Sequence, residues 1–231
     1  MLVEKIYQRE RALLYAERWA RDRNPLFTDY ERLGGNCTNF VSQCLLAGSC
    51  VMNFTPVFGW YYRSDADRSA SWTGVRFFYD FIVGNQAEGP YGREVAPDAL
   101  ETGDVIQLGN GRQGFYHSLL VVGKEGEDYL VAAQSDDALE RPLSTYNYEF
   151  ARYLHIEGVR LRLPDTADCF DALYSGAALV FVGEPEESLP PSVPLPPMTV
   201  PLNETEGETP SEEPMEELPE QMPPEVPSAE E

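Results

Sequence analysis

Residues 34–45 read GGNCTNFVSQCL, and this stretch decides how the rest of the chain is interpreted. Its apolar residues recur at the spacing of one helical face, so we expect a helix that buries this face. These residues are Phe40, Val41, Cys44 and Leu45. Cys37 then lies at the amino-terminal end of the helix, where the helix dipole and free backbone N–H groups lower the pKa of a thiol. The thiolate is the form of cysteine that attacks a carbonyl carbon.

The charge of the chain is unevenly distributed along its 231 residues. Residues 184–231 hold 14 of the 39 acidic residues, 13 of the 19 prolines and no Lys or Arg. A segment of this composition cannot bury enough apolar surface to offset the entropy of ordering it, so we expect a disordered acidic tail. We therefore predict a domain over residues 1–165, a connecting segment over residues 166–183 and a tail over residues 184–231.

Charge and hydropathy also exclude classes of partner. Outside the tail, 25 acidic residues stand against 17 basic ones without a basic stripe, so nucleic acid is not expected as a partner. No apolar run approaches the ~18 residues of a membrane span. Glu4, Lys5 and Arg9 interrupt the start of the chain before the apolar region of a signal peptide could form. The default expectation is a cytoplasmic protein.

The four cysteines are Cys37, Cys44, Cys50 and Cys169. No Cys-x-x-Cys pair is present, which argues against structural zinc, and the chain is much longer than the small secreted domains that depend on disulfides. We therefore expect four reduced thiols. Cys44 belongs to the apolar helical face, Cys169 is expected to be incidental, and Cys37 is either a nucleophile or a small buried apolar residue.

The order of the remaining patterns predicts an α+β domain. Helices are expected over residues 4–23 and 71–83, and Gly48 is expected to end the helix that Cys37 begins. After Gly103 the chain changes to short apolar and alternating runs, typical of strands. The predicted strands cover residues 104–108, 118–122, 129–133 and 152–163. Helices followed by consecutive strands favour helices packed on an antiparallel sheet.

A cysteine nucleophile needs a base, and the chain contains two histidines. His117 opens an apolar strand, so we expect its ring to project from the strand end toward the helix of Cys37. His155 lies within an alternating strand and is expected to be structural. Gln134 ends the next strand, where a hairpin would bring it beside His117, so we predict that Gln134 orients the ring. Asp136 is the second choice for this role.

Besides residues 34–45, the chain contains several further motifs: Tyr15-Ala16, Asn24-Pro25, Gly59-Trp60-Tyr61-Tyr62, Ser71-Trp72-Thr73-Gly74-Val75, Gly103-Asp104-Val105-Ile106-Gln107 and His117-Ser118. Together, and in this order, these motifs resemble the bacterial putative amidase domain family. This family is similar to the CHAP amidases and other papain-like enzymes that act on cell-wall peptides. The resemblance implies a papain-like fold in which a central antiparallel sheet packs against the helix that carries the nucleophile.

The resemblance also implies a reaction and its residues. Cys37, His117 and Gln134 stand at the family's catalytic positions, although Asn36 and Gln134 replace its usual Asp and His. The implied reaction is hydrolysis of an amide or peptide bond through a thioester at Cys37, with water activated by His117. The chemistry requires no metal or organic cofactor. The implied substrate is a peptide or amide, with peptidoglycan as one candidate.

Two other interpretations remain open at this point. The domain could be a papain-like binding module that has lost turnover and presents its groove and acidic tail to a partner. Alternatively, the tail could be the working part and bind a basic protein, with the domain as its anchor. A thiol-reactive probe separates the first interpretation from an enzyme, because an active site predicts fast modification confined to Cys37.

Overall fold

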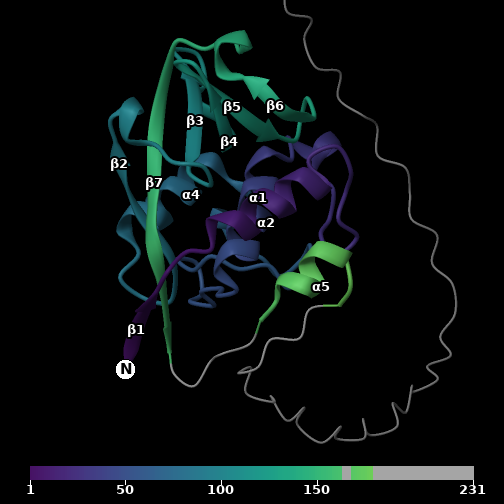
Figure 1. Cartoon of the computed structure of the whole chain (residues 1–231). Helices are drawn as coiled ribbons and strands as arrows, with labels where there is room; N and C mark the ends of the chain where they lie inside the picture. The colour runs from purple at the N-terminus through teal and green to yellow at the C-terminus, as the bar shows by residue number, and fades with distance from the viewer. Residues whose placement is uncertain (163–167, 179–231) are drawn as a thin grey trace, which may run out of the picture. The chain divides into compact units, whose positions relative to one another are not determined.

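The computed structural model describes residues 1–162 and 168–178, which form an α+β domain as the sequence predicts (Figure 1). The helices are α1 (Arg9–Trp19), α2 (Cys37–Ser49), α3 (Ala70–Thr73), α4 (Val75–Gly84) and α5 (Phe170–Ser175). The strands are β1 (Leu2–Lys5), β2 (Gly89–Val95), β3 (Val105–Asn110), β4 (Gly114–Glu125), β5 (Asp128–Ala133), β6 (Ala138–Pro142) and β7 (Phe150–Arg162). The predicted tail over residues 184–231 lies outside the described residues.

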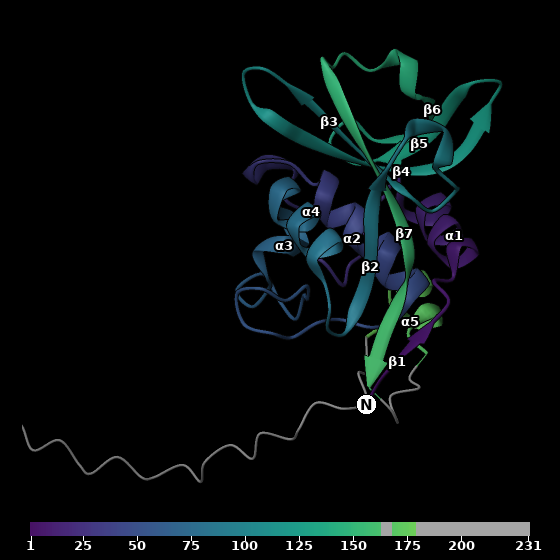
Figure 2. The same cartoon turned by 90° about the vertical axis from the view of Figure 1, so that its left-hand side faces the viewer.

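The strands form one seven-stranded sheet in the order β1-β7-β3-β4-β5-β6, with β2 also paired to β7. Every pairing is antiparallel. Figure 2 looks onto β2 and β7, with α1, α2 and α4 behind them. Because side chains alternate across a strand, Leu120 faces the helices, whereas its neighbours Leu119 and Val121 belong to a second apolar cluster on the opposite face.

All 13 residues of α2 are buried, so this helix is the centre of the domain. The prediction that Gly48 ends it is wrong. The helix continues to Ser49, and Cys50 follows in the left-handed conformation with φ 52°. Gly48 is required by packing instead, since a Cβ there would lie 2.3 Å from the Tyr7 ring. The close contact between Tyr7 and α2 therefore depends on this glycine.

Other predicted elements need correction. The segment predicted as one helix over residues 4–23 begins with the edge strand β1, and α1 starts only at Arg9. The helix predicted over residues 71–83 is divided into α3 and α4 at Gly74, whose backbone is extended. The strands predicted at 104–108, 118–122, 129–133 and 152–163 overlap β3, β4, β5 and β7. Strands β1, β2 and β6 were missed.

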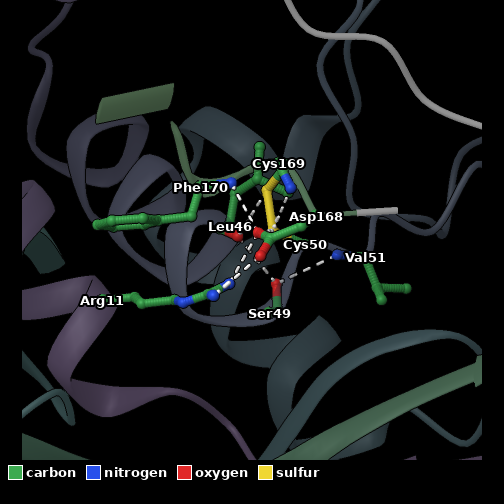
Figure 3. Close-up of a disulfide and its surroundings, with 8 residues drawn as sticks. All are labelled: Arg11, Leu46, Ser49, Cys50, Val51, Asp168, Cys169 and Phe170. Atoms are coloured by element: carbon green, nitrogen blue, oxygen red, sulfur yellow. Dashed lines mark hydrogen bonds and ion pairs between the residues drawn. A yellow bond between two sulfur atoms is a disulfide. The ribbon is translucent and has the colours of Figure 1, made fainter. Parts of the chain in front are cut away.

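A disulfide joins Cys50 to Cys169, with Cα atoms 5.4 Å apart (Figure 3). The prediction of four reduced thiols is therefore wrong for this pair. Cys50 caps the carboxyl end of α2, and Cys169 directly precedes α5, so the fold brings together residues 119 positions apart. Only Cys37 and Cys44 are free among the cysteines, and both are buried.

An ion pair strengthens the same junction. The Arg11 guanidinium donates two hydrogen bonds to the Asp168 carboxylate, at 2.8 and 2.9 Å, and lies 5.2 Å from the centre of the Phe170 ring (Figure 3). Leu173 of α5 is fully buried, and its carbonyl accepts a hydrogen bond from the Asn24 amide at 2.8 Å. α5 is thus held to α1 and α2 by covalent, ionic and apolar contacts.

Candidate active site

Cys37 is the first residue of α2 and is 8% exposed. Its sulfur lies 3.8 Å from the Thr38 hydroxyl and within reach of the backbone N–H of Ser118 on β4. Burial raises the pKa of the Cys37 thiol, and this effect outweighs the opposing hydrogen bonds from Ser118 and Thr38. The expected lowering of this pKa at the helix end is therefore wrong, because desolvation dominates. The resting side chain is a neutral thiol.

Polar contacts fix the start of α2 to the sheet. The hydroxyl groups of Thr38 and Ser118 lie 3.0 Å apart, and the Gln107 amide donates to the Ser118 hydroxyl at 3.0 Å. Ser118 directly follows His117 in β4. The fold therefore brings the Cys37 sulfur to the backbone of the residue after His117. The His117 ring itself lies on the other face of the sheet, beside Tyr146, so the expectation that it projects toward the helix of Cys37 is wrong.

His117 is 9% exposed and is packed against aromatic rings. Its ring centre lies 6.3 Å from that of Tyr116 and 5.9 Å from that of Tyr146. Burial lowers the pKa of His117 to about 4, and the nearby charge of Asp136 opposes this shift. The ring is thus neutral at neutral pH and able to accept a proton. In the part of the chain that the structure describes, no hydrogen bond joins it to Cys37 or Gln134.

Gln134 contacts the residue before the nucleophile instead of the His117 ring. Its amide oxygen accepts a hydrogen bond from the Asn36 amide, and its amide nitrogen donates to the carbonyls of Trp19 and Asp22, both at 2.8 Å. The register explains this placement. Leu120 lies opposite Ala132, so Gln134 stands opposite Ser118, whose side chain points to the face opposite that of His117. The expected contact between Gln134 and His117 is not formed.

Asn36 was noted in the sequence only as a replacement for the family's Asp, and Ser135 was given no role, but the structure places both at the start of α2. The Asn36 backbone N–H donates to the Ser135 hydroxyl at 2.6 Å, and the Asn36 side-chain oxygen accepts from the Tyr30 N–H and the Asn39 amide. Ser135 and Asp136 both have positive φ, 65° and 76°. Such backbone is costly for residues with side chains and concentrates at functional sites. The only signal in the sequence is a glycine-free polar turn, Gln134 to Asp137, after a buried strand.

His155 lies in a separate polar cluster. Its Nδ1 is 2.8 Å from the Asp104 carboxylate, which also accepts hydrogen bonds from Arg9 at 2.7 Å and from the Ile156 N–H at 2.9 Å. Asp104 is fully buried, so these contacts link α1, β3 and β7 through one carboxylate. The arrangement agrees with the structural role expected of His155.

A pocket of about 470 Å³ lies between residues 53–59 and α4, lined among others by Asn53, Phe58, Phe77 and Asn85, and none of the predicted site residues lines it. Within residues 1–162 and 168–178, no group of three His, Cys, Asp or Glu side chains could hold a metal ion. None of the helices in these ranges is long and apolar enough to cross a membrane.

Comparison with known proteins agrees with the resemblance drawn from the motifs. A family model described as "Putative amidase domain" matches residues 6–156, which include Cys37, His117 and Gln134. The Bacillus subtilis (strain 168) protein "Uncharacterized protein YhbB" is 36% identical over 141 residues. The aligned region covers 58% of this chain and 43% of that relative, so the chain spans less than half of its length. No solved structure gives a significant match.

Proposed function

The chain belongs to the putative amidase domain family, and from this premise we propose that it hydrolyses an amide or peptide bond through a thioester at Cys37, with His117 as general base. Amide hydrolysis is what the family suggests. The Cys–His mechanism and a papain-like architecture are our proposal. One observation carries it: the only free cysteine at a helix start touches the backbone of the residue after His117, within residues 1–162 and 168–178.

The protonation states support a general-base route. Cys37 is a neutral thiol and His117 a neutral imidazole, so the sulfur proton passes to a ring nitrogen as sulfur bonds to the carbonyl carbon. The amide C–N bond then breaks, and the imidazolium gives that proton to the leaving amine. Water, deprotonated by His117, finally splits the thioester into a carboxylate and the thiol. Backbone N–H groups at the start of α2 stabilise the oxyanion.

This route requires His117 to leave its present stacking. The ring now packs on Tyr116 and Tyr146, so we propose that substrate binding turns it toward the sulfur. Catalytic hydrogen bonds often tighten only in the complex with substrate. The Asp136 charge, which already acts on His117, would stabilise the imidazolium. In this scheme Asp136 takes the electrostatic role and Gln134 positions Asn36 and the helix start.

We propose a peptide as substrate, with cell-wall peptides as the first candidates. The Cys50–Cys169 disulfide supports this choice, because structural disulfides form in oxidising compartments. The disulfide favours such a compartment over the cytoplasmic location expected from the sequence.

The test measures the release of amine when the full chain is incubated with a panel of cell-wall peptide fragments and N-acylated peptide anilides. Cys37→Ala and His117→Ala should each remove nearly all turnover, and the double variant should be little worse, because residues acting as a unit are non-additive. Cys44→Ala is the matched control, since Cys44 is the other free buried cysteine of α2. Full activity of Cys37→Ala, or loss of activity in Cys44→Ala, contradicts the proposal.

One observation favours a second function. The His117 ring makes no hydrogen bond to Cys37 within the described residues, an arrangement that also suits a binding module without turnover. That function predicts peptide binding by the folded chain with no amine release, and binding unchanged in Cys37→Ala. Release of amine that depends on Cys37 excludes it.

A further inference from the structure

Arg152 on β7 is a buried cation that lacks an anionic partner. The residue is 9% exposed, and its Nε donates one hydrogen bond to the Gln107 side-chain oxygen, at 2.7 Å. Its Nη2 atom is buried and has no hydrogen-bond partner. Among the residues that the structure describes, no carboxylate forms an ion pair with it. Arginine is rarely buried unless it is paired, because removing its charge from water costs several kcal/mol.

Two aromatic rings hold the guanidinium plane. Its central carbon lies 3.6 Å from the centre of the Tyr79 ring and 3.9 Å from that of Phe115. Stacked rings attract the cation but accept none of its in-plane hydrogen bonds. Nε already donates to Gln107, so the Nη edge is the part left for a further acceptor. Burial accordingly lowers the pKa of Arg152.

Glu94 is one of the two acidic side chains whose charge acts on Arg152, and Asp80 is the other. The Glu94 carboxylate accepts a hydrogen bond from the Tyr79 hydroxyl at 3.0 Å, and its charge acts on Arg152 without an ion pair. Arg160, eight residues further along β7, shows the contrast. It stacks on Tyr91 at 3.5 Å but also pairs with Glu4 at 3.2 Å and donates to the Asn85 carbonyl.

Arg152 lies in line with the candidate nucleophile. It stands opposite Gln107 on β3, which stands opposite Ser118 on β4. Hydrogen bonds connect these three side chains, and Ser118 reaches Thr38 beside Cys37. Since neighbouring strands are about 4.8 Å apart, Arg152 and Ser118 are separated by about 10 Å along this row. An extended peptide covers that distance in about three residues, at about 3.3 Å per residue.

We propose that Arg152 binds a carboxylate of the substrate, about three residues from the amide bond that Cys37 attacks. The inference rests on the proposed function and narrows its substrate to peptides that carry a free carboxylate at this distance. A guanidinium offers two parallel N–H groups that match a carboxylate, and the Tyr79 and Phe115 rings fix the plane in which this fork lies.

Nuclear magnetic resonance of the full chain labelled with ¹⁵N-arginine tests the site directly. Acetate is titrated at constant ionic strength, with acetamide as its neutral analogue. The Arg152 side-chain signal, assigned by its loss in Arg152→Lys, should shift and saturate with acetate, and acetamide should bind at least tenfold more weakly. The Arg160 signal is the internal control and should not move. No saturable shift, an equal response to acetamide, or an equal response at Arg160 overturns the proposal.

Further titrations identify the source of the carboxylate. They also distinguish a failure of the Arg152 site from a failure of the proposed function. N-acetyl-Ala-Ala carries a terminal carboxylate and N-acetyl-Glu-amide a side-chain one, and the tighter ligand identifies the source. The measurements need no turnover and are repeated in Cys37→Ala. An acetate response without any amide hydrolysis removes the proposed function and keeps the anion site. Hydrolysis that continues without an acetate response at Arg152 removes the site and keeps the function.

Discussion

At the scale of single residues, burial decides the chemistry of both proposed catalytic groups. It raises the pKa of Cys37 and lowers the pKa of His117, so both side chains are neutral before substrate arrives. The helix dipole, on which the sequence argument relied, is weaker than desolvation at a residue that is 8% exposed. In the proposed mechanism, reactivity then depends on proton transfer during attack instead of on a preformed thiolate.

The two free thiols should differ in their rate of alkylation. Iodoacetamide should modify Cys37 at least tenfold faster than Cys44, because Cys44 is fully buried and burial raises its pKa well above the usual value. The rate at Cys37 should rise with pH above neutrality, since its own pKa is raised. Peptide mapping by mass spectrometry gives both rates. Equal rates, or faster labelling of Cys44, would show that the helix start is not accessible.

His117 should make the domain less stable in acid. Its pKa is about 4 in the folded chain and about 6.5 when unfolded, so the unfolded state binds the extra proton between these values. The free energy of unfolding therefore falls as the pH drops through this window, by about 2 kcal/mol between pH 7 and pH 5. Urea unfolding of the native chain and of His117→Gln should show that the free energy of unfolding depends less on pH in the variant. Identical pH dependence would contradict a buried neutral ring.

The sequence singles out candidate residues for the site, but it does not predict their contacts. Cys37 and His117 stand out because few cysteines and histidines exist to choose from. The partner of Gln134 depends on strand register, and a shift of one position exchanges the two faces of the sheet. Arg152 gave no signal at all, since an arginine in an alternating strand normally faces solvent.

At the scale of elements, α2 is fixed at both ends by different chemistry. Gln134 and Ser135 from the β5–β6 turn hold Asn36 at its start, and the disulfide holds Cys50 at its end. The position of the Cys37 thiol therefore depends on a turn and a bond that lie outside the helix.

Gln134→Ala should weaken both stability and turnover. The change leaves the Asn36 amide and the carbonyls of Trp19 and Asp22 without their partner, at a cost of about 1–3 kcal/mol in unfolding free energy. A shifted helix start should also lower kcat by about 10–100-fold, as for other supporting residues. Gln113→Ala is the control, because Gln113 is exposed on the β3–β4 turn and should change stability by less than about 0.5 kcal/mol. Equal effects of both substitutions would refute the positioning role.

Long, periodic elements were predictable, and short edge elements were not. α2 and the strands after Gly103 carry clear apolar patterns. β1 has only four residues, three of them exposed, so nothing in its composition distinguishes it from the beginning of a helix. The break at Gly74 was not predicted because the apolar spacing continues across it.

At the scale of the whole domain, the disulfide joins residues 119 positions apart and closes a loop that contains most of the sheet. Reduction should lower the free energy of unfolding by about 2–5 kcal/mol, because the open chain gains conformational entropy when it unfolds. Urea unfolding with and without a thiol reductant measures the loss. The Cys50→Ser/Cys169→Ser chain is the control and should respond little to reductant. A native chain that is equally stable with and without reductant would contradict the crosslink.

The same bond determines how the domain carries mechanical load. A pulling force applied between the amino terminus and the residues after α5 enters at Cys169 and passes directly to Cys50 through the sulfur atoms. Residues 51–168 then lie off the force path, and with them β2 to β7, His117 and Arg152. Tension along the chain would be borne by β1, α1, α2 and α5. Most of the sheet would remain folded while the oxidised bond holds.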